Sequence, residues 1–121
     1  MNSKPLKKTV AVIGVGRVGL PLALVLAEEG YLVYGIGRDH EKIRSLTKGI
    51  MPFREEGAPA LLKKHVNKRF VPTADYSIIE MSDYIVLTLG TPIDENMNPV
   101  YDQIDTSLQS ARPFFRPGQT L

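Results

Sequence analysis

The stretch Gly14-Val15-Gly16-Arg17-Val18-Gly19 has the pattern G-x-G-x-x-G, and the residues on either side of it decide the fold. Before it, Thr9 to Ile13 is a continuous β-branched and apolar run, typical of a parallel strand that is buried on both faces. After it, Leu20 to Glu29 is predicted to be a helix, with Pro21 tolerated in the first turn and Gly30 as its end. A strand, a glycine turn and a helix in this order indicate a dinucleotide-binding turn.

Each glycine of the turn has its own task in such a site. The first allows a sharp turn out of the strand, the second lets the backbone approach a pyrophosphate, and the third lets the helix pack against the strand. The pyrophosphate then meets backbone N–H groups and the positive end of the helix dipole. We therefore assign Gly14, Gly16, Arg17, Val18 and Gly19 to cofactor binding; the alternative is a glycine turn with a purely structural role.

Strands and helices alternate along the rest of the chain. Further strands are predicted at 31–36, 70–71 and 84–89, and helices at 39–48, 60–66, from 73 or 75 to 81, and 102–111. Asp39 is predicted to cap the helix at 39–48, which Gly49 ends, and Thr73 or Asp75 to cap the helix that reaches residue 81. This alternation predicts an α/β fold: a Rossmann-type parallel sheet with helices on both faces and strand order 3-2-1-4, truncated near the start of strand five. We expect the cofactor at the carboxyl ends of strands one and four.

The end of the second strand bears on the choice of cofactor. The acid that binds the ribose of NAD is expected about 20 residues after the glycine turn, and Gly37 occupies its place. Gly37 leaves room for a 2′-phosphate, and Arg38 supplies a bidentate partner for it. Alternatively, Arg38 stacks on the adenine or lies in solvent while Asp39 binds the ribose. The cofactor is therefore NAD or NADP, with Gly37, Arg38 and Asp39 as site residues.

Composition excludes several function classes. The 121 residues suit one domain, and a net charge of +2 is too small to indicate a nucleic-acid partner. No cysteine is present, which excludes disulfides, thiolate zinc sites and a cysteine nucleophile within this chain, and suits a reducing cytoplasm. Arg17 and the glycines interrupt the apolar N-terminal run, so we expect no membrane span. His40 and His65 stand alone in the sequence, so no metal site is expected.

Four stretches together resemble one known family. Val10 to Gly19 followed by Leu20-Pro21-Leu22-Ala23 is similar to the opening V-I-G-x-G-Y-V-G-L-P-x-A of the UDP-glucose/GDP-mannose dehydrogenases. The three stretches that resemble later motifs of that family are Lys48 to Gly57 with Leu61-Leu62, Leu89 to Asp94 with Asn98-Pro99 and Asp102, and Phe115 to Gly118. The resemblance extends from Val10 to Leu121.

The resemblance implies a function that composition cannot. This family oxidises the C6 alcohol of a nucleotide-linked sugar to a carboxylate, using two NAD per sugar, and the uronic acids feed surface polysaccharides. By the same resemblance, Leu89, Gly90, Thr91 and Pro92 border the cofactor, and Glu55 lies near the sugar. The nucleotide sugar is then the expected partner.

Departures from the family pattern limit what this chain should do alone. Arg17 replaces an aromatic residue and Gly37 replaces an acid. The family's cysteine nucleophile belongs to a later domain, so we expect residues 1–121 to be a single dinucleotide-binding domain of a longer enzyme, inactive by itself. Losing the outer strands would leave strand four as an open edge, which predicts a homodimer. The main alternative is a stand-alone nucleotide-sensing regulatory domain; a degenerate domain used for protein interaction is a third.

Overall fold

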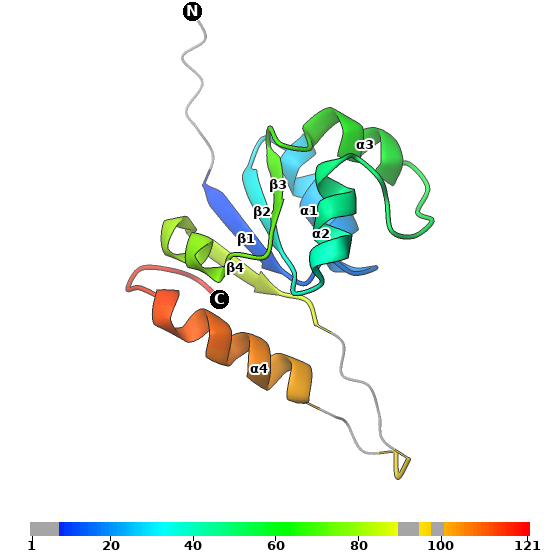
Figure 1. Cartoon of the computed structure of the whole chain (residues 1–121). Coiled ribbons are helices and arrows are strands. Elements are labelled where there is room, and N and C mark those ends of the chain that lie inside the picture. Colours follow the sequence, from blue (N-terminus) through cyan, green and yellow to red (C-terminus); the bar gives the residue numbers. More distant parts are fainter. Residues whose placement is uncertain (1–7, 90–94, 98–100) are drawn as a thin grey trace, which may run out of the picture.

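The computed structural model describes residues 8–89, 95–97 and 101–121. Its four strands are β1 (Thr9–Ile13), β2 (Leu32–Ile36), β3 (Phe70–Thr73) and β4 (Tyr84–Leu87). Its α-helices are α1 (Gly19–Glu28), α2 (His40–Thr47), α3 (Ala58–His65) and α4 (Asp102–Ala111), joined by the 3₁₀ helices η1 (Tyr76–Met81) and η2 (Arg112–Phe114). Figure 1 shows these elements around a central sheet.

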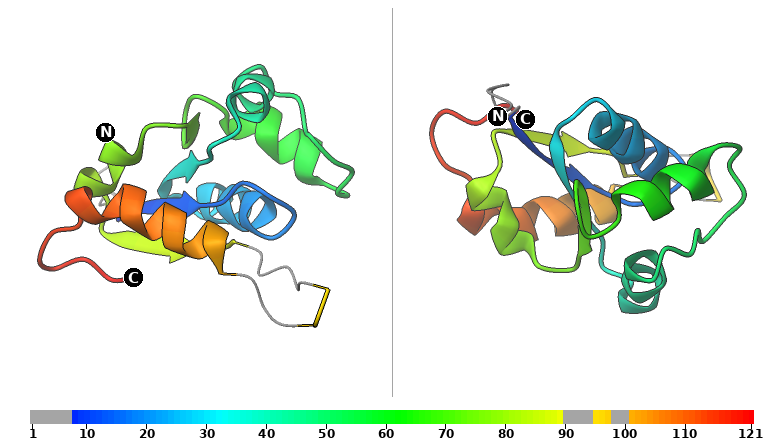
Figure 2. Two further views of the ribbon diagram at one scale, coloured as in Figure 1. Left: turned by 60° about the horizontal axis from the view of Figure 1, so that its bottom comes forward. Right: turned by 90° about the horizontal axis from the view of Figure 1, so that it is seen from above.

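The sheet has the order β3-β2-β1-β4, and every pair of neighbours is parallel. This confirms the predicted Rossmann-type α/β fold and its strand order. The helices α1, α2 and α3 lie on one side of the sheet, and η1 and α4 lie on the other (Figures 1 and 2). β1 pairs with both β2 and β4, so the chain crosses from one half of the sheet to the other beside β1.

Two apolar cores explain why β1 consists of unbroken apolar sequence. Val10 and Val12 point into the core with α1, and Ala11 and Ile13 point into the core with η1 and α4. Because both faces are covered, no position from Val10 to Ile13 can be polar without burying an unpaired group. The predicted burial on both faces is confirmed.

Several element boundaries differ from the sequence prediction. β3 is longer than predicted and includes Pro72, which is tolerated because β3 is an edge strand and a missing N–H on its outer side costs no sheet hydrogen bond. The segment predicted as a helix up to residue 81 is the 3₁₀ helix η1, whose first turn is capped by Asp75. α3 begins at Ala58 because Gly57, with φ of +82°, turns the chain into it.

The last residues of the chain lie against the outer edge of β4. Ile85 donates its N–H to the carbonyl of Thr120 at 2.8 Å, and Thr120 donates to the carbonyl of Asp83 at 3.1 Å. This pairing fits the expected start of a fifth strand. It also corrects the expectation of an open edge, because the first half of β4 is already paired.

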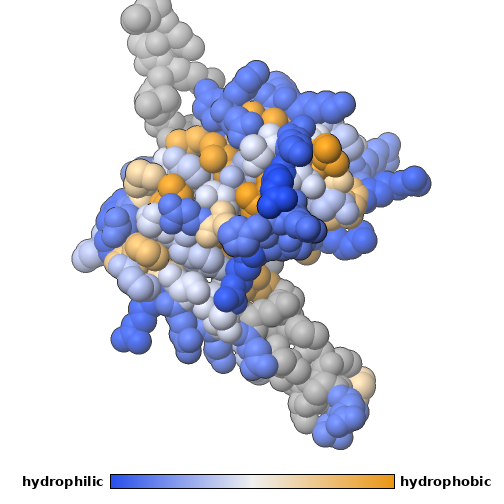
Figure 3. Space-filling model, in the orientation of Figure 1, coloured by the Kyte–Doolittle hydropathy of each residue, from blue (hydrophilic) through white to orange (hydrophobic). Residues whose placement is uncertain are grey.

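The surface is mixed in character. The face shown in Figure 3 is mostly hydrophilic, with small separate apolar patches between polar side chains. Within the described part of the chain, no helix has both the length and the apolar content needed to span a membrane.

Candidate cofactor-binding site

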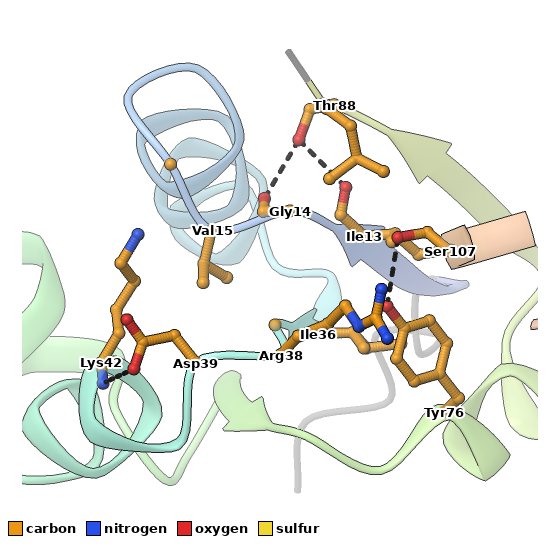
Figure 4. A pocket seen from close by; sticks show the side chains of 13 residues that line it. Ile13, Gly14, Val15, Ile36, Arg38, Asp39, Lys42, Tyr76, Thr88 and Ser107 are labelled. Carbon is orange, nitrogen blue, oxygen red and sulfur yellow. Dashed lines mark hydrogen bonds between the residues drawn. The ribbon is translucent and has the colours of Figure 1, made fainter. Parts of the chain in front are cut away.

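A pocket of about 510 Å³ lies at the carboxyl ends of the central strands. Its floor is formed by the last residues of β1 and β2, Ile13 and Ile36, and by Thr88 and Leu89, which follow β4 (Figure 4). This is the switch point of the sheet, because the connection after β1 leads to α1 on one face and the connection after β4 leads to α4 on the other. Its volume is in the range of small-molecule and cofactor sites.

The first and third glycines of the turn are required by packing. Gly14 has φ of +109°, and a Cβ on it would lie 2.6 Å from the carbonyl oxygen of Thr88. A Cβ on Gly19 would overlap the carbonyl oxygen of Gly14 and the hydroxyl of Thr88. The fold itself therefore explains why these two positions carry no side chain.

Gly16 has no such explanation inside the protein. A Cβ on Gly16 would meet no atom of the described residues within 4 Å, and Gly16 lines the pocket. No side chain caps the N-terminus of α1, and no acid lies in its first turn. An anion beside Gly16 would therefore meet the positive end of the helix dipole, in a space that a side chain would otherwise fill. The turn fits a dinucleotide pyrophosphate.

Thr88 fixes the turn from the opposite strand. Its hydroxyl donates to the carbonyl oxygens of Ile13 at 3.2 Å and Gly14 at 3.0 Å, and its N–H donates to Ile13 at 2.9 Å (Figure 4). Thr88 could not be identified as a site residue from the sequence, because these contacts join residues more than 70 positions apart.

Gly37 is enclosed by apolar side chains at the end of β2. A Cβ on Gly37 would lie 2.9 Å from a methyl carbon of Val15 and 3.2 Å from Cδ1 of Ile43. Glycine therefore serves close packing here, and a longer side chain would have to displace both neighbours.

The polar residues after Gly37 have two roles: Asp39 caps α2, and Arg38 and Lys42 line the pocket. Asp39 accepts hydrogen bonds from the backbone N–H groups of Glu41 at 3.0 Å and Lys42 at 3.2 Å, which confirms its predicted role as the cap of α2. Arg38 and Lys42 both line the pocket. In Figure 4, Arg38 extends towards Tyr76 while Lys42 and Asp39 lie on the other side.

The far wall of the pocket comes from η1 and α4. Tyr76 donates its hydroxyl to Oγ of Ser107 at 3.4 Å, and Ser107 is buried. Asp75, just before Tyr76, accepts hydrogen bonds from the hydroxyl and the N–H of Ser77, and these hold the pKa of Asp75 below its ordinary value. Sequence reasoning missed Tyr76, Ser107 and Lys42, because only the tertiary fold brings them to the end of β1.

The predicted site residues are placed as follows. Those that line the pocket are Gly14, Gly16, Gly37, Arg38, Asp39 and Leu89. Arg17, Val18 and Gly19 are not among the lining residues. Gly19 packs against the backbone of Gly14, and the Val18 side chain is 71% exposed. The Arg17 guanidinium lies 5.2 Å from the ring centre of Phe53. Glu55 is exposed in the loop before α3 and is not among the lining residues. Gly90, Thr91 and Pro92 fall outside the described residues.

Metal-binding side chains are not grouped in the described part of the chain. Across residues 8–89, 95–97 and 101–121, no three His, Cys, Asp or Glu side chains come together in a way that could hold a metal ion.

Comparisons with known proteins find matches over most of the chain. A family model described as the UDP-glucose/GDP-mannose dehydrogenase family, NAD binding domain, matches residues 8–120. UDP-glucose 6-dehydrogenase TuaD of Bacillus subtilis is 41% identical over 90 residues, which are 73% of this chain and 20% of that protein. NDP-N-acetyl-D-galactosaminuronic acid dehydrogenase from Methanosarcina mazei Go1 has a similar structure, with a TM-score of 0.85 and 28% identity over 93% of this chain and 26% of that one. GDP-mannose dehydrogenase from Pseudomonas aeruginosa follows with a TM-score of 0.80 and 28% identity, over 84% and 24% of the two chains.

These matches confirm the resemblance inferred from the motifs. They favour a dehydrogenase domain over the nucleotide-sensing alternative. The chain spans between 20% and 26% of the length of each of these three relatives.

Proposed function

This chain belongs to the UDP-glucose/GDP-mannose dehydrogenase family of NAD-dependent oxidoreductases, and from that membership we propose that it is the single domain with which a larger nucleotide-sugar dehydrogenase binds its dinucleotide cofactor. The observation that carries the proposal concerns Gly16, which lines the pocket at the uncapped N-terminus of α1. A Cβ on Gly16 would meet no atom of the described residues within 4 Å.

Different residues of the site bind different parts of the dinucleotide. The backbone from Gly14 to Gly19 holds the pyrophosphate, with Arg17 and Val18 contributing N–H groups rather than side chains. The apolar part of the pocket, at Ile13, Ile36 and Leu89, takes the adenine. Gly90, Thr91 and Pro92 border the other half of the cofactor, by family resemblance. The family supports NAD, and Gly37 followed by Arg38 favours NADP.

The remaining properties of the enzyme are proposed from the family. When bound, the cofactor would supply a hydride acceptor; two such oxidations with the addition of one water would convert the C6 alcohol of a UDP- or GDP-sugar to a uronic acid, which serves polysaccharide synthesis. Glu55 lies on the sugar side. Since the chain contains no cysteine, it binds cofactor without turning the sugar over. The absence of cysteine also suits a cytoplasmic setting. We further propose a homodimer that forms along the second half of β4, the part that does not pair with Thr120.

Calorimetric titration of the chain with NAD and with NADP tests the proposal. The wild-type chain should bind at least one of the two, and Gly16→Ala should lower that affinity at least about tenfold, because its methyl group takes the space of the pyrophosphate. Val25→Ala is the matched control, since it changes an exposed side chain of α1 that does not line the pocket and should leave the affinity unchanged. The absence of binding by the folded wild-type chain would refute the proposal.

A further inference from the structure

We propose that Arg17 is a positioning residue: its side chain holds the loop of residues 51–57 against the glycine turn, so that cofactor binding and the order of this loop depend on each other. The inference rests on the proposed function and deepens it. The cofactor proposal uses only the backbone N–H group of Arg17, whereas the side chain makes a separate contact with Phe53.

This contact joins the glycine turn to the loop between α2 and α3 (Figure 1). The Arg17 guanidinium lies 5.2 Å from the centre of the Phe53 ring, inside the limit of about 6 Å for a cation–π interaction. Phe53 is partly buried and packs against the core that α1 shares with α3. Arg17 therefore contacts a ring that the core itself holds in place.

Few hydrogen bonds hold this loop. Within the described part of the chain, residues 51–56 take part in one hydrogen bond, from the N–H of Ala58 to the carbonyl oxygen of Glu55 at 3.1 Å. That bond joins the loop to the first residue of α3, so it does not attach the loop to the glycine turn. Met51 and Phe53 are the loop residues that pack against the core. The position of the loop beside the turn therefore depends on side-chain packing, to which the Arg17–Phe53 contact belongs.

Among the described residues, no carboxylate pairs with Arg17 to hold it elsewhere. The ion pairs found there join Glu28 to Lys64 and to His65. Arg17 is exposed and does not line the pocket. The contact that orients its guanidinium is therefore the Phe53 ring, and not a carboxylate or the wall of the cofactor pocket.

The backbone and the side chain of Arg17 connect two parts of the site. Under the proposed function, its N–H group belongs to the turn that binds the pyrophosphate. A cofactor that orders this backbone also restricts the side chain, and through Phe53 the loop; by linkage, an ordered loop raises the affinity for the cofactor. The same loop carries Glu55, which lies on the sugar side under the proposed function. Arg17 thus links the cofactor to the part of this chain nearest the sugar.

Two measurements on the 121-residue chain test the inference. Nitrogen-15 relaxation gives order parameters for the amides of Arg54 to Gly57 with and without saturating NAD, and calorimetry gives the affinity for NAD. In the wild-type chain, NAD should raise the order parameters of these amides. In Arg17→Ala they should be lower without ligand, and NAD should no longer raise them. The NAD affinity of this variant should decrease about two- to fivefold, the equivalent of one exposed cation–π contact.

Paired variants separate the contact from the charge. Arg17→Tyr keeps a planar side chain that can stack on Phe53 and should retain wild-type values in both measurements. Phe53→Leu keeps an apolar side chain in the core but removes the ring, so it should behave like Arg17→Ala. The double variant should lose no more affinity than either single variant, because both remove the same contact. The matched control is Arg54→Ala, which removes an exposed cation of the same loop and should leave the NAD affinity unchanged.

The outcomes distinguish this inference from the proposed function. If NAD binds, but Arg17→Ala keeps the loop order and the NAD affinity of the wild type, the inference is wrong while cofactor binding stands. If Arg17→Ala weakens NAD binding equally in the wild-type and Phe53→Leu backgrounds, Arg17 contacts the cofactor directly and the inference is also wrong. If NAD does not bind the folded chain, the inference and the proposed function fail together.

Discussion

A single methyl group should have different consequences at Gly16 and at Gly19 of the turn. At Gly19 it would overlap the carbonyl oxygen of Gly14, which belongs to the backbone and cannot move aside cheaply. We predict that Gly19→Ala lowers the free energy of unfolding by about 1–3 kcal/mol or more. Gly16→Ala should change it by less than about 1 kcal/mol, because its Cβ meets open space.

Urea unfolding followed by circular dichroism measures both variants of the turn. Equal destabilisation by Gly16→Ala and Gly19→Ala would contradict the distinction between a ligand-facing glycine and a packing glycine. That distinction is the basis for assigning Gly16 to the cofactor.

Thr88 should stabilise the turn through its hydroxyl. In Thr88→Val the shape is kept, but the hydrogen bonds to the carbonyls of Ile13 and Gly14 are lost. The free energy of unfolding should decrease by about 1 kcal/mol. Thr88→Ser keeps the hydroxyl and is the control; if it is as unstable as Thr88→Val, packing of the methyl group matters more than these hydrogen bonds.

The helix α2 depends on its cap. Asp39→Ala removes the acceptor of two N–H groups and should destabilise the protein by about 1 kcal/mol, while Asp39→Asn should retain most of the stability. The same pair tests whether Asp39 binds the ribose. We expect Asp39→Asn to leave NAD affinity within about threefold of wild type, and a loss of tenfold or more in calorimetry would show that the carboxylate contacts the cofactor.

The helices α1 and α3 are joined by charged groups. Glu28 accepts hydrogen bonds from Lys64 and, at 3.4 Å, from the buried His65. The bond from Lys64, and then that from His65, holds the pKa of Glu28 below its ordinary value of 4.5. A lowered carboxyl pKa contributes stability above the unfolded-state pKa, and this contribution disappears as the pH falls through the folded-state pKa.

The Glu28 contacts therefore predict a specific pH dependence. Thermal unfolding of Glu28→Gln from about pH 6 to about pH 3, which brackets the ordinary carboxyl pKa, should show a smaller decrease in stability on acidification than the wild-type chain. Glu41→Gln, an exposed acid on α2, serves as the control. Identical slopes for wild type and Glu28→Gln would exclude a role of this carboxylate in acid stability.

The elements that the sequence predicted well are those with strong local signals. The strand at Thr9–Ile13 follows from its β-branched run, and α2 follows from the cap at Asp39 and the glycine after it. The six residues of η1 were harder to predict, because 3₁₀ and α turns share the same capping signal at Asp75. The wall at Tyr76 and Ser107 could not be predicted, since it depends on how η1 and α4 pack across the sheet.

The outer edge of the sheet, at β4, is not fully open as the sequence predicted. Thr120 pairs with the first half of β4. Under the homodimer proposal, light scattering should give the mass of a dimer at high concentration. Thr120→Pro, which removes the N–H that Asp83 accepts, should increase the dimer fraction by exposing more edge. A monomer at all concentrations, in both proteins, would contradict the proposal.

At the scale of the whole molecule, the fold brings the ends of β1, β2 and β4 together, and we propose that they surround one dinucleotide. Backbone amide NMR during titration with NAD and NADP tests this claim most directly. The largest shift changes should fall on Gly14 to Gly19, on Gly37 to Lys42 and on Thr88 and Leu89, with little change at α3 or at the C-terminal residues 116–121. Shift changes centred elsewhere, or none at millimolar cofactor, would contradict the account.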